Sequence, residues 1–468
     1  MSKDLVSNTV EKFIEVEKAN NFFSINIKNH NFWEYLRVDI CNKIIDQKNE
    51  FNKSKTIIEK KRKYYLYPLN IIYLLFNKLK LFLLKNNYDV ILLNQDRSII
   101  NNGKKVNIHI YPIAKYLSKF FKVLIINQSN QSIPDKKIKS INEVPVNIFS
   151  LFFARFIIFN KIELKLLNRI KKTISKEFNL ELDIISMAKR TYFYKIYYRK
   201  KLFIKLFNKF KNKIFFYYSD HSSEGIVEAA KVSSVKSIEL QHSLISEFDI
   251  RYRIPFDITK TVPDYIFTYG DYWNNIYKLR SKTISIGFNY LNENYIKYFD
   301  SKDNQKNKII IYSGILSNRN LQIILDELSI ALPGKIIYFK LRQEEYFDWR
   351  NNYPEYLINR KNIIFIDNDD KPVHSYMSEC SWQIGVDSTL IYEGLAFGLI
   401  TFILKTGWFE QMKNLFNNDL AFLVTDSKEI LRLINIGKIP SKKIQKNEIF
   451  KNNVELNLLN AVKKIIHV

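Results

Sequence analysis

The sequence predicts an α/β protein with two doubly wound parallel sheets that face a cleft, and with extra basic helices in the first of its two domains. Short apolar runs of strand length alternate with stretches of helical spacing in both parts of the chain. Ten of the eleven glycines lie at or after Gly225, where tight strand-to-helix turns are expected. Residues 300–307 are polar and aperiodic, which is typical of a linker. We therefore expect two Rossmann-like domains, over residues 1–299 and 308–468.

The elements of the first domain are expected in the following order. The first 87 residues have helical spacing, for example at Val10, Phe13 and Ile14. A basic helical insertion covers about residues 154–213. Strands are expected near residues 88–93, 121–127, 214–218, 237–240, 265–268 and 283–286.

The second domain repeats the alternation without a sequence repeat that can be aligned. Its strands are expected at residues 309–312, 336–339, 363–366, 382–386 and 400–404. Helical stretches such as residues 321–332 separate them. This pattern indicates a second parallel sheet with crossover helices.

The net charge of the chain is +26, from 73 Lys and Arg against 47 Asp and Glu among 468 residues, and it is concentrated in two stretches. Residues 52–85 hold nine basic residues and one acid, and residues 154–213 hold 17 basic residues and four acids. Three interpretations are open: helices on an anionic membrane surface, a nucleic-acid site, or an ordinary solvated face. Because no nucleic-acid motif accompanies the charge, we expect no nucleic-acid partner and favour a peripheral position on an anionic membrane surface.

The rest of the composition excludes several classes of protein. Hydrophobic residues make up 46% of the chain, which excludes a disordered protein. Cys41 and Cys380 lack partner spacing, which excludes a disulfide scaffold and fits a reducing cytoplasm. No signal peptide is visible, and Pro68 and several polar residues interrupt the best candidate for a membrane span, residues 64–84. The cysteines and the six histidines show no metal-ligand spacing. The acidic run at 367–370 follows a predicted strand, where such a run can hold a divalent metal, but a plain acidic turn is the favoured interpretation. We therefore expect no metal and no cofactor.

In parallel sheets of this kind, ligands bind beyond the carboxyl ends of the strands, so polar residues at predicted strand ends are the candidates for a site. After the strand at residues 382–386, Ser388 and Thr389 open a helix whose free N–H groups favour a phosphate. Glu393 lies one turn further on the same face, where a carboxylate accepts hydrogen bonds from ribose hydroxyls. The alternative is that Ser388 only caps the helix and that Glu393 is solvated.

Two other strand ends of the second domain carry groups that suit a nucleotide diphosphate. Ser313 and Gly314 follow the first strand, and Arg319 adds a cation to their backbone donors. Lys340 and Arg342 lie at the end of the next strand and are of like facing.

Polar loops also follow strands of the first domain. Their carboxylates and imidazoles are suited to act as acid, base or nucleophile, and a structural role is the alternative for each histidine. The catalytic candidates are Asp96, Asp220, Glu224 and His242, with Gln241 and Ser243 as further residues of the cleft.

Four runs of the sequence belong together: Glu239 through Ser246 with Tyr252, Pro263 through Trp273, Gly385 through Gly394, and Asn31 through Arg37. These runs resemble bacterial surface-polysaccharide glycosyltransferases of the GT-B fold. The resemblance implies a nucleotide-sugar donor on the C-terminal domain, a glycan or lipid-linked glycan acceptor on the N-terminal domain, and an O-antigen or capsule product. It also implies a reaction that needs no metal and a position at the inner face of the cytoplasmic membrane.

Three positions depart from the pattern of that family. Ser243 stands where a glycine usually follows Gln-His, Asp249 stands where a histidine is expected, and Arg342-Gln343 stands where Lys-x-His-Pro is common. Two other functions therefore remain open. One is a polyol-phosphate transferase of related architecture, and the other is a basic membrane- or nucleic-acid-binding protein without catalysis.

Overall fold

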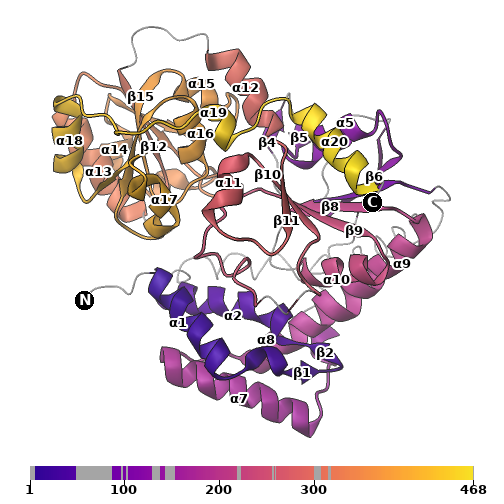
Figure 1. Ribbon diagram of the computed structural model, residues 1–468. Coiled ribbons are helices and arrows are strands. Elements are labelled where there is room, and N and C mark those ends of the chain that lie inside the picture. Colours follow the sequence, from indigo (N-terminus) through magenta and orange to yellow (C-terminus); the bar gives the residue numbers. More distant parts are fainter. Residues whose placement is uncertain are drawn as a thin grey trace.

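A computed structural model describes residues 6–48, 87–95, 99–101, 104–128, 138–142, 153–218, 223–255, 258, 260–299, 307–314 and 318–466. Two parallel sheets with flanking helices form two Rossmann-like domains, and a group of helices lies below the first sheet in the view of Figure 1. The predicted fold class is therefore confirmed.

The first sheet has seven strands in the order β11-β10-β9-β8-β3-β6-β7, and each neighbouring pair is parallel. In chain order the strands run outward from β3 to β7 on one side and from β8 to β11 on the other, so the direction reverses between β3 and β8. All five residues of β3 are buried, as expected for a parallel strand covered on both faces. The strands are β3 (Val90–Asn94), β6 (Val123–Asn127), β7 (Lys139–Asn142), β8 (Ile214–Tyr218), β9 (Lys236–Leu240), β10 (Tyr265–Thr268) and β11 (Lys282–Ser285).

The second sheet has six parallel strands in the order β14-β13-β12-β15-β16-β17. Its direction reverses between β12 and β15. The strands are β12 (Lys308–Tyr312), β13 (Ile337–Lys340), β14 (Ile363–Ile366), β15 (Cys380–Gly385), β16 (Ile400–Leu404) and β17 (Phe422–Val424).

Helices cover both faces of the first sheet. One face packs against apolar side chains of α9 (Lys201–Phe210) and α10 (Glu224–Val232). The other face packs against α5 (Ile110–Leu117) and the C-terminal α20 (Val454–Ile466). Figure 1 shows α20 beside α5, away from the other helices of the second half of the chain. The last helix thus belongs to the core of the first sheet, whereas the predicted division assigned all of residues 308–468 to the second domain.

The remaining helices connect the strands and the two sheets. Trp273 of α11 lies with its ring centroid 4.5 Å from that of Tyr392 of α16, and its indole N–H donates to the Ile449 carbonyl oxygen at 2.9 Å. These contacts join the first domain to the second. The helices are α11 (Asp271–Ile276), α12 (Asn289–Phe299), α13 (Asn318–Ala331), α14 (Glu355–Ile358), α15 (Val373–Met377), α16 (Leu390–Ala396), α17 (Lys413–Asn417), α18 (Ser427–Asn435) and α19 (Lys446–Ile449).

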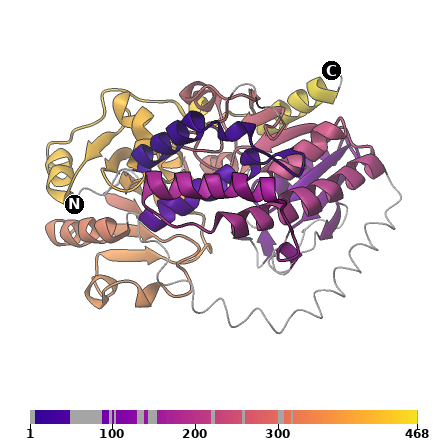
Figure 2. The same cartoon turned by 90° about the horizontal axis from the view of Figure 1, so that it is seen from below.

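A third cluster of buried side chains defines a helical unit below the first sheet (Figures 1 and 2). The unit consists of α1 (Val6–Ala19), α2 (Trp33–Lys48), α7 (Lys161–Phe178), α8 (Ile184–Thr191) and the π-helix η3 (Tyr192–Lys200). Inside it, Arg37 pairs with Glu17 at 2.7 Å, and both side chains are 1% exposed. A buried pair of this kind is sustained only when its other hydrogen bonds are made, and Trp33 supplies one to Glu17 at 2.8 Å.

Short elements complete the described chain: η1 (Phe22–Ser24), the hairpin pairs β1 (Asn26–Ile27) with β2 (His30–Asn31) and β4 (Ile99–Asn101) with β5 (Lys104–Val106), and the turns η4 (Trp349–Asn351) and η5 (Phe409–Met412). The basic stretch 52–85, the candidate span 64–84 and nearly all of the predicted linker lie outside the described residues. No helix among the residues that the structure describes is long and apolar enough to cross a membrane.

Candidate functional site

The reversal point of the second sheet brings two predicted donor loops together. β12 and β15 are hydrogen-bonded neighbours, and their carboxyl ends lead into Ser313-Gly314 and into Asp387, Ser388 and Thr389. Doubly wound sheets bind ligands at such a point, because the loops after the two strands turn to opposite faces and leave a crevice. The two loops therefore lie next to each other at the carboxyl edge of the sheet.

Glu345 fixes the loops after β12 and β13. Its carboxylate accepts hydrogen bonds from the Ser313 hydroxyl, from the Arg342 backbone N–H at 2.8 Å and from the Tyr353 hydroxyl at 2.7 Å. Asn318, the first residue of α13, donates to the same carboxylate at 3.2 Å. A single half-buried acceptor thus sets the position of Ser313, and sequence reasoning did not identify it because it lies between strands without a motif.

The two basic residues predicted at the end of β13 have different surroundings. The Lys340 ammonium contacts the Tyr346 hydroxyl and lies 3.7 Å from the Asp369 carboxylate, and burial lowers the pKa of Lys340. The Arg342 side chain is more exposed. Burial raises the pKa of Asp387, and the positive charge of the nearby Arg342 guanidinium opposes part of that rise. Arg342 therefore lies near Asp387 at the reversal point, and Lys340 contacts Tyr346 and Asp369 at the end of β13.

Glu393 is held by a buried histidine. Its Oε2 atom lies 2.6 Å from Nε2 of His374, which comes from α15 and is fully buried. Phe397 stacks on the imidazole at 5.6 Å, and the ring of Tyr290, at the start of α12, lies 5.5 Å away. The carboxylate predicted to bind ribose is thus fixed in orientation rather than solvated.

The other predicted donor residues lie at helix starts. Ser388 Oγ accepts the Leu390 N–H at 3.3 Å, so the hydroxyl caps α16 locally. Thr389 is the N-cap residue of that helix and makes no side-chain cap hydrogen bond. Arg319 is the second residue of α13 and has an exposed side chain.

The carboxyl edge of the first sheet gathers aromatic and imidazole rings. His242 follows β9, is 6% exposed, and lies with its ring centroid 5.3 Å from that of Tyr218 at the end of β8. His109 lies 6.0 Å from the same tyrosine ring and stacks on Phe288 at 5.0 Å. Asp96 and Asp220 fall outside the described residues, so their relation to His242 remains a prediction.

Gln241 links the loops after β9 and β10. Its Oε1 accepts the Tyr269 N–H at 2.8 Å, and its Nε2 donates to the Ser243 carbonyl oxygen at 3.1 Å. With His109, Tyr269 and Phe288 it also lines a pocket of about 350 Å³, including its open mouth. The Gln241 amide therefore holds the loops after β9 and β10 together. Its role as a residue of the cleft stays a prediction.

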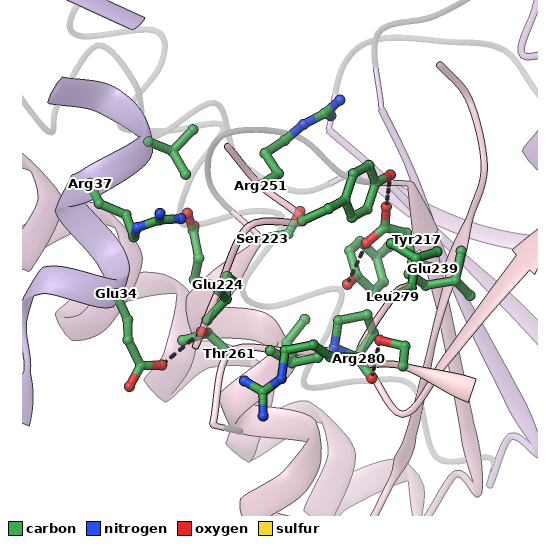
Figure 3. Close-up of a pocket in the computed structure, with 18 of the residues that line it drawn as sticks. Glu34, Arg37, Tyr217, Ser223, Glu224, Glu239, Arg251, Thr261, Leu279 and Arg280 are labelled. Atoms are coloured by element: carbon green, nitrogen blue, oxygen red, sulfur yellow. Dashed lines mark hydrogen bonds between the residues drawn. The ribbon is translucent and has the colours of Figure 1, made fainter. Parts of the chain in front are cut away.

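A larger cavity, about 730 Å³ including its open mouth, lies between the helical unit and the first sheet (Figure 3). In Figure 3, Glu34 and Arg37 project into it from α2, and Tyr217 and Glu239 lie on the side of the sheet. Its lining is rich in ionisable groups: Glu34, Arg37, Glu224, Glu239, Arg251 and Arg280.

Glu224, one of the four catalytic candidates, lies in this cavity. It is the first residue of α10, and Lys195 of the π-helix lies 3.2 Å from its carboxylate. The Lys195 ammonium also lies 3.2 Å from Asp39 and donates to the Tyr35 carbonyl oxygen at 2.8 Å. Burial raises the pKa of Glu224 to about 7, and the lysine opposes that rise. The structure therefore brings Glu224 to the cavity and leaves His242 at the edge of the sheet.

Glu239 also lines this cavity. It begins one of the runs that carry the family resemblance, but the sequence assigned it no role of its own. It accepts hydrogen bonds from the Tyr252 hydroxyl at 2.8 Å and from the Tyr217 hydroxyl at 3.4 Å (Figure 3). Burial raises the pKa of Glu239 to about 7, and the nearby Arg251 lowers it in part. The sequence did carry one signal for this residue, because an acid lies in a strand that is otherwise buried. Burying a carboxylate costs free energy unless it finds hydrogen-bond partners.

The loop after β9 contacts both the helical unit and the second domain. Arg37 donates to the Ile250 carbonyl oxygen at 2.6 Å, which ties the loop to the helical unit. Glu247 pairs with Lys413 of α17, which ties the loop to the second domain. Within the loop, Arg251 donates to Ser243 Oγ at 3.1 Å.

No cluster of three or more His, Cys, Asp or Glu side chains that would suit a metal occurs among the described residues. The acidic turn after β14 is engaged otherwise. Asp367 accepts the Trp349 indole N–H at 2.9 Å, and Asp369 accepts the Tyr346 hydroxyl at 2.8 Å. These contacts agree with the interpretation as a structural turn.

No protein-family model and no curated protein matches the chain. Among solved structures, S. aureus MnaA in a structure with UDP has a TM-score of 0.50 at 10% identity, covering 81% of this chain and 96% of that one. UDP-GlcNAc 2-epimerase from Neisseria meningitidis bound to UDP-GlcNAc has a TM-score of 0.49 at 12% identity, with coverages of 80% and 99%. A glycosyltransferase from Rickettsia africae has a TM-score of 0.45 at 15% identity, with coverages of 81% and 99%.

At these identities the likeness shows the fold alone. MnaA matches over both sheets, since the alignment covers 81% of the chain. The chain therefore has the two-domain, Rossmann-like GT-B architecture that its sequence predicts.

Proposed function

We propose that the protein is a glycosyltransferase that moves a sugar from a nucleotide-sugar donor to a growing surface polysaccharide, an O-antigen or capsule chain. The observation that carries the proposal is the arrangement at the reversal point of the second sheet. There, Ser313 is set by Glu345, Ser388 lies on the neighbouring loop, and Glu393 is oriented by His374.

These groups match the parts of a nucleoside diphosphate. The N–H groups of the loops after β12 and β15, with Arg342, Arg319 and the hydroxyls of Ser388 and Thr389, would bind the phosphates. His374 engages one oxygen of Glu393, so the other oxygen would accept hydrogen bonds from the ribose. MnaA was solved with UDP on the same fold, which makes UDP the first nucleotide to test.

The reaction would take place against the first domain. The bond between the anomeric carbon and the phosphate oxygen breaks, the acceptor hydroxyl oxygen bonds to that carbon, and its proton passes to a base. His242, Glu224, Asp96 and Asp220 are the candidates for that base. Arg342 and Lys340 would stabilise the charge on the departing nucleoside diphosphate.

The test begins with thermal melting in the presence of UDP, CMP, GDP and CDP, because a nucleotide that binds the folded chain raises the melting temperature. The matching nucleotide-sugars are then incubated with the protein and with lipid-linked glycan, and free nucleotide is measured. Release of nucleotide that depends on the acceptor and is lost in Glu393→Gln is the expected result.

The alternatives give different products. Turnover of nucleotide-polyols only would instead identify a polyol-phosphate transferase. Conversion of a nucleotide-sugar into an isomer without release of nucleotide would identify an epimerase. Failure of every nucleotide to bind would contradict the proposal and leave a basic binding protein without catalysis.

A further inference from the structure

The helical unit exposes large apolar side chains on a strongly basic background. Phe156, Ile158 and Ile162 are 66%, 79% and 73% exposed, and Phe153 and Tyr197 are 44% and 48% exposed. These five residues are here called the apolar ridge: four of them lie between residues 153 and 162, and Tyr197 lies in the π-helix η3. Scattered single apolar residues need no explanation, but a group of this kind marks an interaction surface.

Ring contacts show that part of the ridge is continuous. Phe153 stacks on Phe193 at 5.5 Å between centroids, and Phe193 stacks on Tyr197 at 5.9 Å. The Lys201 ammonium lies 4.2 Å from the centroid of Tyr197. Phe156, Ile158 and Ile162 lead from this row into the start of α7, which lies across the outer face of the molecule in Figure 2.

The charge around the ridge has one sign. Among the described residues 153–213, thirteen exposed side chains are Lys or Arg and two are Asp or Glu. In α7, Lys165 and Arg169 lie three and seven positions after Ile162, which places them on the same outward face. The acid of the first turn, Glu163, is buried and closes a capping box with Asn160.

The apolar face of α7 is not available to a partner. Leu167, Ile170 and Ile174 are buried in the core of the helical unit, and α9 buries its apolar face against the first sheet. The sequence suggested that such faces would lie on lipid, and the structure shows that they pack inside the protein. Any contact with a membrane must therefore come from side chains that point outward, as those of the ridge do.

We propose that the apolar ridge inserts into the interface of an anionic bilayer while the surrounding cations bind the lipid headgroups. Aliphatic and aromatic side chains at the centre with Lys and Arg around them are what such an interface takes up. A nucleic acid would use the rings but gains nothing from exposed isoleucines. A second copy of the chain would bring two surfaces of like charge together. The inference does not depend on the proposed donor site.

The test uses flotation of the full chain with neutral phosphatidylcholine vesicles and with vesicles that also contain phosphatidylglycerol. Wild type is expected to bind the anionic vesicles and to lose binding at high salt. The triple variant Phe156→Ser, Ile158→Ser, Ile162→Ser should bind them at least about tenfold more weakly. Lys165→Glu with Arg169→Glu should have a similar effect.

The matched control changes three exposed apolar residues of the second half of the chain, Phe347→Ser, Ile330→Ser and Ile436→Ser, which are 102%, 60% and 61% exposed. It should bind vesicles like wild type. Equal vesicle binding by wild type and the ridge variant would overturn the proposal, as would wild type that does not float. Binding of single-stranded DNA without flotation, or a dimer that the ridge variant abolishes, would assign the surface to another partner. Nucleotide-induced melting shifts should be unchanged in the ridge variant, which separates this test from that of the donor site.

Discussion

His374 Nε2 lies 2.6 Å from Oε2 of Glu393, and the two side chains come from the helices on either side of β15. The imidazole is fully buried, and Glu393 is 7% exposed. A buried donor that binds one oxygen of a carboxylate fixes the orientation of the whole group, and with it the direction in which the other oxygen points. Metal-binding histidines are oriented in the same way, by a hydrogen bond to the ring nitrogen that does not bind the metal. The relation gives the Glu393 carboxylate a fixed orientation near the reversal point of the second sheet.

The first prediction concerns this pair. His374→Ala should weaken nucleotide binding roughly tenfold, because Glu393 loses the donor that orients it. His374→Gln retains an N–H donor and should restore part of the affinity. Calorimetric titration with the nucleotide measures both, and a purely structural role would lower the melting temperature of both variants without a difference in affinity between them.

Glu345 is expected to be a positioning residue for Ser313. Glu345→Gln replaces one acceptor oxygen by an N–H group that faces donors, so we expect a loss of about 1–3 kcal/mol in the free energy of unfolding. Nucleotide affinity should fall as well. The neighbour Glu344, whose side chain is 63% exposed, supplies the control: Glu344→Gln should change the unfolding free energy by less than about 0.5 kcal/mol. Equal urea-unfolding curves for the two variants would refute the role of Glu345.

Because of Glu239, the free energy of unfolding should fall as the pH rises. Burial raises the pKa of Glu239 to about 7 from an ordinary value of 4.5. Between these values the folded chain holds a proton that the unfolded chain has released, so the contribution is complete below pH 4.5 and is lost as the pH rises through about 7.

Glu239→Gln isolates this effect, because the amide keeps the shape of the side chain and does not ionise. At about pH 8 the variant should be more stable than wild type by up to about 3 kcal/mol, and at about pH 5 the difference should nearly vanish. Urea unfolding of both proteins at the two pH values provides the measurement. A difference that is independent of pH would show that Glu239 is ionised throughout.

Gly225 tests the contact between the helical unit and the first sheet. A Cβ atom at this position of α10 would lie 1.9 Å from the Lys195 carbonyl oxygen of the π-helix. Because a backbone oxygen has little room to move, Gly225→Ala should cost roughly 1–3 kcal/mol of stability. Gly334, where a Cβ would meet nothing within 4 Å, is the control, and Gly334→Ala should leave the melting temperature nearly unchanged. Equal melting of the two variants would contradict the close approach of α10 and η3.

Buried strands were predictable because a parallel strand covered on both faces is a short apolar run. Residues 214–218 and 309–312 were expected as strands; β8 occupies the first range with five buried residues, and β12 occupies the second with four. β7 has the sequence Lys-Ser-Ile-Asn at the edge of its sheet, so no apolar run announced it. The return of α20 to the first sheet was not predictable either, because an amphipathic helix does not encode which core it joins.

Part of the candidate site was also predictable from the sequence, and part was not. The adjacency of Ser313 and Ser388 follows from strand order, since both lie at the ends of strands that meet where the sheet reverses. His374 and Glu345 orient Glu393 and Ser313 from segments with no motif of their own, so only the folded chain identifies them. Glu239 lay within a recognised run, but its partners Tyr217 and Tyr252 come from another strand and a loop.

Hydrogen–deuterium exchange, with and without the nucleotide that raises the melting temperature, measures whether a nucleotide binds at the reversal point between β12 and β15. We expect slower exchange in the loops that hold Ser313-Gly314 and Asp387 to Thr389, and in the first turn of α16. Protection confined to the loops of the first sheet, or no protection anywhere at saturating nucleotide, would contradict it.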